Sequence, residues 1–215
     1  MATAHGVATN YNESVWSTGY SMPRFYPNVI TMQKGIQIDD VIESIAPNLP
    51  AGSGVKNSFD ELKLEDLGFR SAFQAHWYCR PPGKNVTKHK ESKLELRTVN
   101  SQADLRYWVS GWGQGDGIFN SSIAADECVE LIYATQGGDV LSGLVINHSE
   151  GSVGISNIFG TGDALLTCLA AVVETHSSKG IVGYGDENEI ATLSVFGFEK
   201  IGDLRVWIKE KMQNS

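Results

Sequence analysis

The chain has 215 residues, of which 41% are hydrophobic and 20% charged, a composition typical of a globular protein with a full hydrophobic core. Its formal net charge is −8 and no run of Lys and Arg forms a basic stripe, which argues against a nucleic-acid partner. No stretch of about 18 apolar residues is present, so we expect no membrane span.

The N-terminal sequence and the cysteines indicate a reducing, cytoplasmic setting. Residues 1–10, "MATAHGVATN", have neither a basic start nor an apolar segment, so no secretory signal is expected. The three cysteines, Cys79, Cys128 and Cys168, lie far apart and form no CxxC pair and no metal-binding spacing.

The first third of the chain predicts a small α/β lobe over residues 27–82, preceded by an irregular arm over residues 1–26 that packs through its aromatic residues. Residues 28–32, "NVITM", are β-branched and typical of a strand. Apolar residues at helical spacing predict an amphipathic helix, with Ile38, Val41, Ile42 and Ile45 on one face.

A second short helix is expected over residues 57–69, with Asn57 or Ser58 as its cap. Residues 72–80, "AFQAHWYCR", predict a strand, and Pro81, Pro82 and Gly83 end it. A charged linker follows, and a second domain is expected over residues 93–215.

In this second domain, strands and helices are expected to alternate. Ser101, three residues before Asp104, predicts the start of a helix. The expected strands are residues 94–99, 127–136, 141–148, 151–159, 180–185 and 204–210, and the expected helices are residues 101–112, 163–176 and 187–195. The order β-α-β-β-β-α-β-α-β predicts one mixed sheet, antiparallel at its start, with a parallel β-α-β crossing inside it.

A weak internal repeat relates residues 67–80, "LGFRSAFQAHWYCR", to residues 196–209, "FGFEKIGDLRVWIK". Each segment has Gly-Phe followed by a strand that carries a Trp, and each follows an expected short helix. Either an internal duplication or chance accounts for the similarity.

Glycines mark the passage from an expected strand into the long apolar helix at residue 163. The turn contains Gly160, Thr161 and Gly162. Glycines let a backbone come close to a ligand, and the first amides of a helix have no partners within the helix and favour negative charge. The turn is therefore either a tight strand-to-helix connection or a cradle for an anion such as a pyrophosphate.

This turn and the element order resemble the GCN5-related N-acetyltransferase (GNAT) family. The motif of that family is Gln or Arg, two residues, Gly, one residue, then Gly or Ala, and here the six positions read "NIFGTG", residues 157–162. Near the other end, Gly197-Phe198 and then Gly202-Asp203-Leu204 before a strand with Trp207 also fit the family pattern. The resemblance covers residues 94–209, and residues 27–82 resemble a truncated copy without a glycine turn.

The resemblance implies an acyl-CoA N-acyltransferase-like fold, a mixed sheet flanked by helices with a half-sized N-terminal lobe of similar type. It implies acetyl-coenzyme A as acetyl donor and a primary amine, on a small molecule or a peptide, as acceptor. The loop amides then hold the pyrophosphate, and the preceding strand pairs with the pantetheine arm. The residues implied in coenzyme binding are Ser156, Asn157, Ile158, Phe159, Gly160, Thr161, Gly162, Asp163 and Ala164, with Asp186 or Asn188 as a further contact.

Three departures from the family pattern favour an alternative, a degenerate module that binds acyl-coenzyme A or has a structural or regulatory role without catalysis. Asn157 replaces the usual Gln or Arg, and the loop has no basic residue. Asp163 puts a negative charge near the expected pyrophosphate, although an Asp also suits a helix start. Leu193 stands where the family often has a Tyr that protonates the leaving thiolate.

The catalytic candidates are Tyr184, Glu130 and Ser194. Tyr184 ends an expected central strand and is either a proton donor or a packing residue, and Glu130 is either a base that acts through water or an exposed side chain. Ser194 lies next to the missing Tyr. His148 and Glu150 share a turn without an evident third ligand, so no metal site is expected. The acceptor and the oligomeric state are not fixed by these patterns.

Overall fold

The computed structural model describes residues 6–37, 49–84, 93–114 and 117–211. The chain divides into two compact units: unit 1 comprises residues 1–76 and 202–215, and unit 2 comprises residues 77–201. None of the described helices is long and apolar enough to cross a lipid bilayer. The predicted helix with Ile38, Val41, Ile42 and Ile45 lies outside the described residues, so it stays a prediction.

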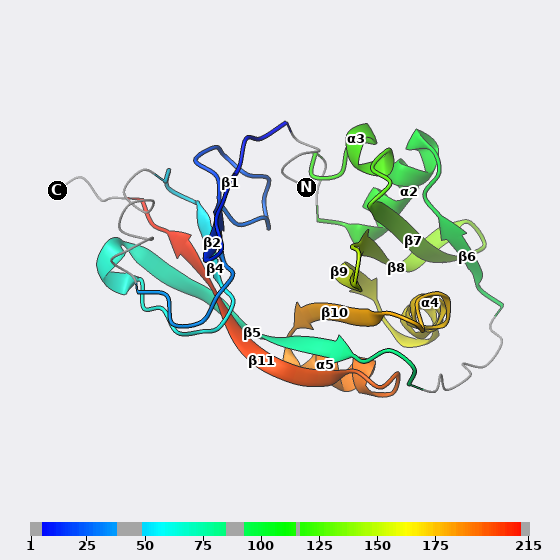
Figure 1. The fold of residues 1–215 in the computed structure, drawn as a ribbon. Coiled ribbons are helices and arrows are strands. Elements are labelled where there is room, and N and C mark those ends of the chain that lie inside the picture. The colour runs from blue at the N-terminus through cyan, green and yellow to red at the C-terminus, as the bar shows by residue number, and fades with distance from the viewer. Residues whose placement is uncertain (1–5, 38–48, 85–92, 115–116, 212–215) are drawn as a thin grey trace. The chain divides into compact units, whose positions relative to one another are not determined.

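Among the described residues, unit 1 is built on four short strands and parts of the two long strands β5 and β11 (Figure 1). In their order across the sheet these are β1 (Asn10–Tyr11), β2 (Val15–Ser17), β3 (Val29–Thr31), β4 (Gly54–Asn57), β11 (Glu199–Lys209) and β5 (Phe69–Arg80). β3 and β4 run parallel, whereas β2 and β3, and β4 and β11, are antiparallel.

The core of unit 1 gathers apolar side chains from strands that are distant in sequence. Val15, Val29, Val55, Phe69 and Trp207 are all at most 3% exposed and belong to one cluster. Val15 and Val29 come from β2 and β3, so burial of alternate residues on these three-residue strands attaches the N-terminal segment to the sheet.

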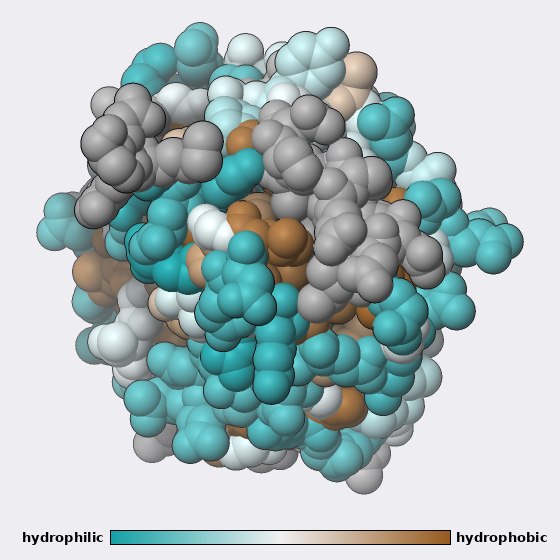
Figure 2. All heavy atoms as spheres, turned by 90° about the vertical axis from the view of Figure 1, so that its left-hand side faces the viewer, coloured by the Kyte–Doolittle hydropathy of each residue, from teal (hydrophilic) through white to brown (hydrophobic). Residues whose placement is uncertain are grey.

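Figure 2 shows a face of the molecule that is largely hydrophilic, with apolar atoms reaching it only in places.

The described residues depart from two expectations for the first third of the chain. Within residues 6–26, part of the arm expected to be irregular and packed by its aromatics, β1 and β2 are strands, and Tyr11 and Tyr20 are 70% and 62% exposed. The short helix expected over residues 57–69 is also absent from this fully described stretch, where β4 ends at Asn57 and one 3₁₀ turn, η3 (Glu65–Leu67), follows. The Asn57 side chain is buried and donates to the carbonyl of Leu62 instead of capping a helix.

Unit 2 contains a mixed sheet and four described α-helices. Its strands, in order across the sheet, are β5, β10 (Gly180–Gly185), β9 (Ser152–Gly160), β8 (Asp139–His148), β7 (Val129–Gln136) and β6 (Glu95–Thr98). Its helices are α2 (Gln102–Trp112), α3 (Ser121–Ala124), α4 (Gly162–Thr175) and α5 (Glu187–Ser194).

The sheet of unit 2 is antiparallel from β6 to β9 and parallel between β9 and β10. Helices α4 and α5 cover one face and α2 the other (Figure 1). On the first face, Cys168, Leu169 and Val173 of α4 pack on alternate residues of the strands, such as Ile132 of β7 and Ile181 of β10. On the other face, Trp108 of α2 is fully buried, and its Nε1 donates to the carbonyl of Ile132.

This architecture confirms the predicted mixed α/β class and the predicted element order from residue 94 onward. The Ser101 hydroxyl accepts from the Asp104 amide and caps α2 as expected. The expected parallel crossing is β9-α4-β10, with Ile181 paired to Val153. α3, a single turn capped by Asn120, was not expected, because four residues are too few to show a helical period.

The two strands of the sequence repeat are the two strands that both units share. β5 begins in unit 1 at Phe69 and ends in unit 2 at Arg80. β11 begins in unit 2 and ends in unit 1. Each follows a glycine with positive φ, Gly68 at 77° and Gly197 at 84°. The compact units divide within β5 and β11, at residues 76–77 and 201–202, and the domain bounds predicted from the sequence, 27–82 and 93–215, stay a prediction.

Trp207 tests the role of β11 in unit 1. Trp207→Ala removes a side chain that is 2% exposed, and its Nε1 has no hydrogen-bond partner among the described residues, so the loss is one of packing. We expect the free energy of unfolding, measured by guanidinium denaturation and circular dichroism, to fall by about 3–5 kcal/mol. Ile201→Ala on the same strand removes a side chain that is 63% exposed, and its effect is expected within about 0.5 kcal/mol. Similar losses for both variants would contradict this account.

Candidate functional site

The last part of β9 carries an irregularity ahead of the glycine turn. Its pairing with β8 shifts between Gly143↔Phe159 and Val145↔Ser156, so β9 uses one residue more than β8 over this step. Asn157 lies inside the shift with a φ of 51°. This is a β-bulge, and bulges bend and twist the strand that carries them. The bulge therefore turns the end of β9 just before the chain enters α4.

Strands β9 and β10 pair over a short length and then part. Their paired residues are 152–154 of β9 and 180–182 of β10. Residues 155–160 and 183–185, all of them described, have no pairing between these two strands. The two strands therefore separate beyond Gly154 and Val182.

Gly160 ends β9 in close contact with β8. Its φ is 88°, and a Cβ at this position would lie 2.7 Å from the Cα of Ser142 and collide with the carbonyl oxygen of Leu141. The close approach that requires this glycine is therefore to the β8 backbone. Gly162 differs, because its φ is 59° and a Cβ there would meet nothing within 4 Å.

The N-terminus of α4 is not capped by a side chain. Thr161 is the N-cap residue and its side chain makes no capping hydrogen bond. In contrast, Ser101, Asn120 and Asp186 cap α2, α3 and α5 with their side-chain oxygens. Thr161, Gly162 and Asp163 are exposed, so the helix start is accessible to an anionic ligand.

A hollow of about 560 Å³ lies beside this helix start. Thr161, Asp163 and Ala164 line it together with Leu141 and Lys93. Lys93 precedes β6, some 70 residues before the turn in sequence, so it supplies a positive charge that the loop itself does not have. The negative charge of Asp163 in the hollow is therefore opposed by a cation from another segment.

The side chains just before the turn serve packing. The Phe159 ring lies edge-on to Trp108, with centroids 5.2 Å apart, and its carbonyl accepts from the Ser142 hydroxyl at 2.7 Å. Ile158 packs against the core under α4 and α5, and the Ser156 hydroxyl lies 3.5 Å from the Asn147 amide nitrogen. Their side chains are thus occupied, which leaves the backbone as the part of this stretch that a ligand can bind.

Tyr184 is held on the face of the sheet opposite α4 and α5. Its ring lies edge-on to Trp77, with centroids 5.4 Å apart. Ile181 packs into the core under α4, and in a strand a residue three positions away projects to the other face. Burial, and then the nearby Glu189, raise the pKa of Tyr184, so the phenol keeps its proton at neutral pH.

Tyr78 and Glu189 form a buried pair near the end of β10 that the sequence did not indicate. The Tyr78 hydroxyl donates to Glu189 Oε1 at 2.9 Å. Burial raises the pKa of Glu189, partly offset by this hydrogen bond, and burial together with Glu189 raises the pKa of Tyr78. Space for the pair exists because Gly183 and Gly185 have no side chains: a Cβ on Gly183 would lie 2.5 Å from the Tyr78 hydroxyl.

Comparison with known proteins identifies the architecture through structure alone. No family model matches the sequence, and no curated protein is similar to it in sequence. A GCN5-related N-acetyltransferase from Kribbella flavida superposes with a TM-score of 0.68 at 10% identity, over 98% of this chain and 94% of that one. A functionally unknown conserved protein from Staphylococcus epidermidis ATCC 12228 gives 0.66 at 11% identity, over 99% and 98% of the two chains.

A tandem GNAT protein from the clavulanic acid biosynthesis pathway, solved without AcCoA, matches over 94% of this chain and 83% of that one, with a TM-score of 0.54 at 10% identity. The chain has the GNAT fold. The resemblance inferred from the glycine turn is thus confirmed at the level of the fold, and the tandem protein is consistent with two units.

Within this GNAT fold, the residues predicted around α5 have local structural roles. Leu193, at the position where the family often has a Tyr, is 1% exposed and packs in the core. The Ser194 hydroxyl donates to the carbonyl of Ala191 in its own helix. Asp186 caps α5 by accepting from the Glu189 amide, and Asn188 is exposed in its first turn.

Glu130 lies away from Tyr184, in another cluster. It sits on the α4 side of β7, two residues before Ile132, and forms an ion pair with His148 at 3.4 Å. Because Glu130 and Tyr184 project from opposite faces of the sheet and come from strands separated by β8 and β9, the fold does not bring these two catalytic candidates together. His176 completes the Glu130 cluster, and burial followed by the charge of His148 lowers the pKa of His176.

The two glycines of the turn have different roles and can be separated by mutation. Gly160→Ala forces a Cβ into the β8 backbone at positive φ, so we expect the free energy of unfolding to fall by about 2–4 kcal/mol. Gly162→Ala meets open space and is expected to cost about 1 kcal/mol, from backbone strain alone. Chemical denaturation of both variants measures the difference, and equal stability would show that the turn does not approach β8 as described.

Proposed function

We propose that this protein transfers an acyl group, acetyl from acetyl-coenzyme A, to a primary amine on a small molecule or a peptide. The observation that carries the proposal is the uncapped start of α4, which lines a hollow together with Lys93 and Leu141. The GNAT fold of structurally similar proteins supports the same activity.

In this proposal the coenzyme pyrophosphate binds the amides of residues 159–164. Hydrogen bonds from amides to a charged oxygen contribute roughly 1.5–3 kcal/mol each where water is excluded. Lys93 attracts the phosphates, and Asp163 in the same hollow weakens their binding. The pantetheine arm pairs with β9 beyond Gly154, where β9 is no longer paired with β10, and Asp186 or Asn188 supplies a further contact from the start of α5.

The chemical step requires the amine nitrogen to attack the thioester carbon. The nitrogen then gives up one proton to water, the carbon–sulfur bond breaks and the thiolate leaves. Holding both groups together supplies most of the acceleration, and backbone amides stabilise the oxyanion. The thiolate then takes up a proton. Leu193 has none to give, so we assign this role to Tyr184, whose raised pKa keeps the phenol protonated, or to water.

A second candidate function is a module that binds acyl-coenzyme A without turning it over. The buried Leu193 and the exposed Asp163 favour it, because the first supplies no acid and the second opposes phosphate. The two functions differ in one measurement: both bind the coenzyme, and only the enzyme releases free thiol in the presence of an amine.

Opposite changes of charge in the hollow test the coenzyme site. By isothermal titration with acetyl-coenzyme A, we expect one coenzyme per chain, since among the described residues a glycine turn that opens an α-helix is found in unit 2 alone. Lys93→Gln should weaken binding by roughly threefold to tenfold, Asp163→Ser should strengthen it by a similar factor, and both effects should shrink at high salt.

Lys179→Gln is the matched control, because it removes one positive charge beyond the other end of α4, where the ammonium contacts the Ser149 carbonyl. An equal loss of affinity in Lys179→Gln and Lys93→Gln would mean that net charge, and not the hollow, determines binding. Two coenzymes per chain would contradict a single site.

Tyr184→Phe tests proton delivery, because it keeps the ring against Trp77 and removes the hydroxyl proton. With an accepted amine, turnover measured by thiol release should fall at least about tenfold, which corresponds to ~1.4 kcal/mol in the barrier. Coenzyme affinity and melting temperature should not change. Turnover within a factor of two of the unmodified protein would leave water as the donor and Tyr184 as a packing residue.

A further inference from the structure

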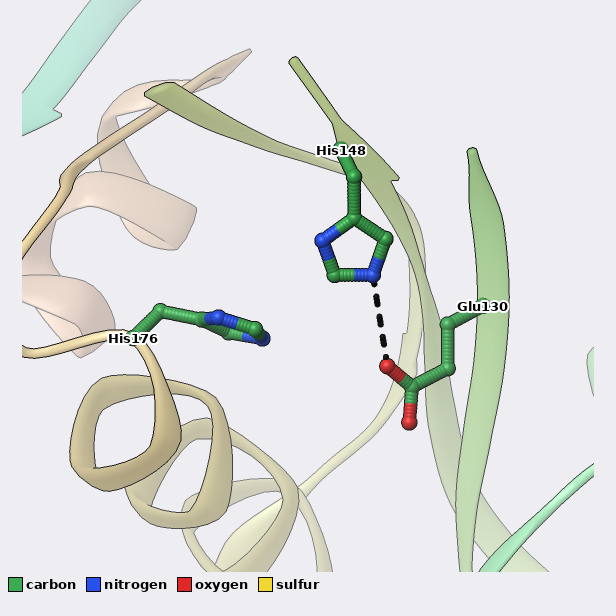
Figure 3. Close-up of side chains that lie close together, drawn as sticks. All are labelled: Glu130, His148 and His176. Carbon is green, nitrogen blue, oxygen red and sulfur yellow. Dashed lines mark ion pairs between the residues drawn. The ribbon is translucent and has the colours of Figure 1, made fainter. Parts of the chain in front are cut away.

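Three side chains from three different elements converge near the C-terminal end of α4 (Figure 3). Glu130 belongs to β7, His148 is the last residue of β8, and His176 is the C-cap residue of α4. One ligand atom from each lies within 4.8 Å of the other two. All three residues are half-buried, so the cluster is accessible to a small ion.

The geometry is close to what a metal ion of the zinc type needs. Two imidazole nitrogens and one carboxylate oxygen are a known zinc ligand set, with bonds of about 2.0–2.2 Å, which puts ligand atoms about 3.4 Å apart in a tetrahedral site. His148 Nε2 and Glu130 Oε2 are already 3.4 Å apart. The His176 ring faces this pair, its centroid 5.2 Å from that of His148, and its ligand atom needs to approach by at most about 1.4 Å.

The surroundings hold two of these ligands in place. The Thr98 hydroxyl donates to Glu130 Oε1 at 3.4 Å, which leaves Oε2 directed at His148. The backbone amide of His148 donates to the Cys128 carbonyl at 2.8 Å and fixes the end of β8. Partners of this kind, outside the ligands themselves, orient a metal site.

The electrostatics of this position also favour a cation. The C-terminus of a helix carries the negative end of its dipole, and Glu130 adds a full negative charge. Lys179 is the opposing group, but its ammonium is bonded to the carbonyl of Ser149. The ion pair between His148 and Glu130 is a simpler explanation for the positions of these two residues, because it needs no metal.

The ion pair does not explain why His176 lies beside them.

We propose that Glu130, His148 and His176 form a Zn²⁺ site that clips the C-terminal end of α4 to the β7–β8 hairpin. α4 has 14 residues and is therefore about 20 Å long, so the site lies well away from the glycine turn. It is independent of acyl transfer and has a structural or regulatory role. With three protein ligands, a fourth position stays open to water or to a further donor.

The test uses Zn²⁺ alone with the untagged, chelator-treated full chain. We expect isothermal titration to show one Zn²⁺ bound per chain, with a Kd in the micromolar range or lower. Saturating Zn²⁺, at a hundredfold excess over Kd, should raise the melting temperature by roughly 5–10 °C. Co²⁺ in place of Zn²⁺ should give the visible absorption bands of a site with nitrogen and oxygen ligands.

Glu130→Gln and His176→Gln each remove one ligand and should each lower the affinity at least tenfold and abolish the thermal shift. His76→Gln is the matched control, since it removes a histidine that pairs with Asp203 in unit 1, and it should bind Zn²⁺ like the unmodified protein. The proposal is overturned if Glu130→Gln and His176→Gln keep the affinity and the thermal shift, or if the unmodified protein binds Zn²⁺ more weakly than about 100 μM. Because the Co²⁺ spectrum is read on the unmodified chain, it decides the question even if a variant does not fold.

Discussion

The parting of β9 from β10 is the constraint on which the candidate acyl-transfer site depends. Two parallel strands normally satisfy each other's backbone groups along their whole length, and here they do so only as far as Gly154 and Val182. The bulge at Asn157 bends β9 at this point, and the small residues Gly183 and Gly185 keep β10 free of side chains on the α5 face. The gap is thus built into the sheet and does not require a mobile lid.

The turn at the end of β9 depends on the same parting and is fixed from two sides. Gly160 presses on the β8 backbone, and Phe159 is held in the aromatic cluster of α2. Neither contact involves the amides at the start of α4, which no side chain caps. The turn that carries these amides is nevertheless held in place by the two contacts. A rigid, unsatisfied set of donors binds an anion at a low entropic cost, because little has to be ordered on binding.

The sequence predicted the parts of this design that are local in the chain. The glycine turn, the apolar helix after it and the β9-α4-β10 crossing follow from periodicity and turn residues, and all were found as expected. The predictions from the sequence failed where the structure of a few residues depends on partners that are distant in the chain. β2 is a strand because β3 pairs with it, and Asn57 does not cap a helix because its amide is occupied by a loop carbonyl.

The same limit explains which site residues the sequence did not reveal. Lys93 lines the hollow of Asp163 across 70 positions of sequence, and Tyr78 reaches Glu189 across 111. No spacing rule links such residues. A signal existed only for Gly183 and Gly185, since two glycines on one strand indicate the close approach of another group. Glu130 was found as a residue of interest, but its partners could be identified only from the sheet register and the length of α4.

Because β5 and β11 each belong to both units, the order in which the strands are synthesised matters. In unit 1, β11 lies between β4 and β5, so this sheet stays open at its centre until residues 202–209 have left the ribosome. Unit 2, in turn, uses the end of β5, which is made before any of its other strands. The strands made first must therefore wait for the last described strand, with apolar residues such as Val55 and Phe69 unprotected in the meantime. Until β11 is made, these apolar residues can associate with those of other nascent chains.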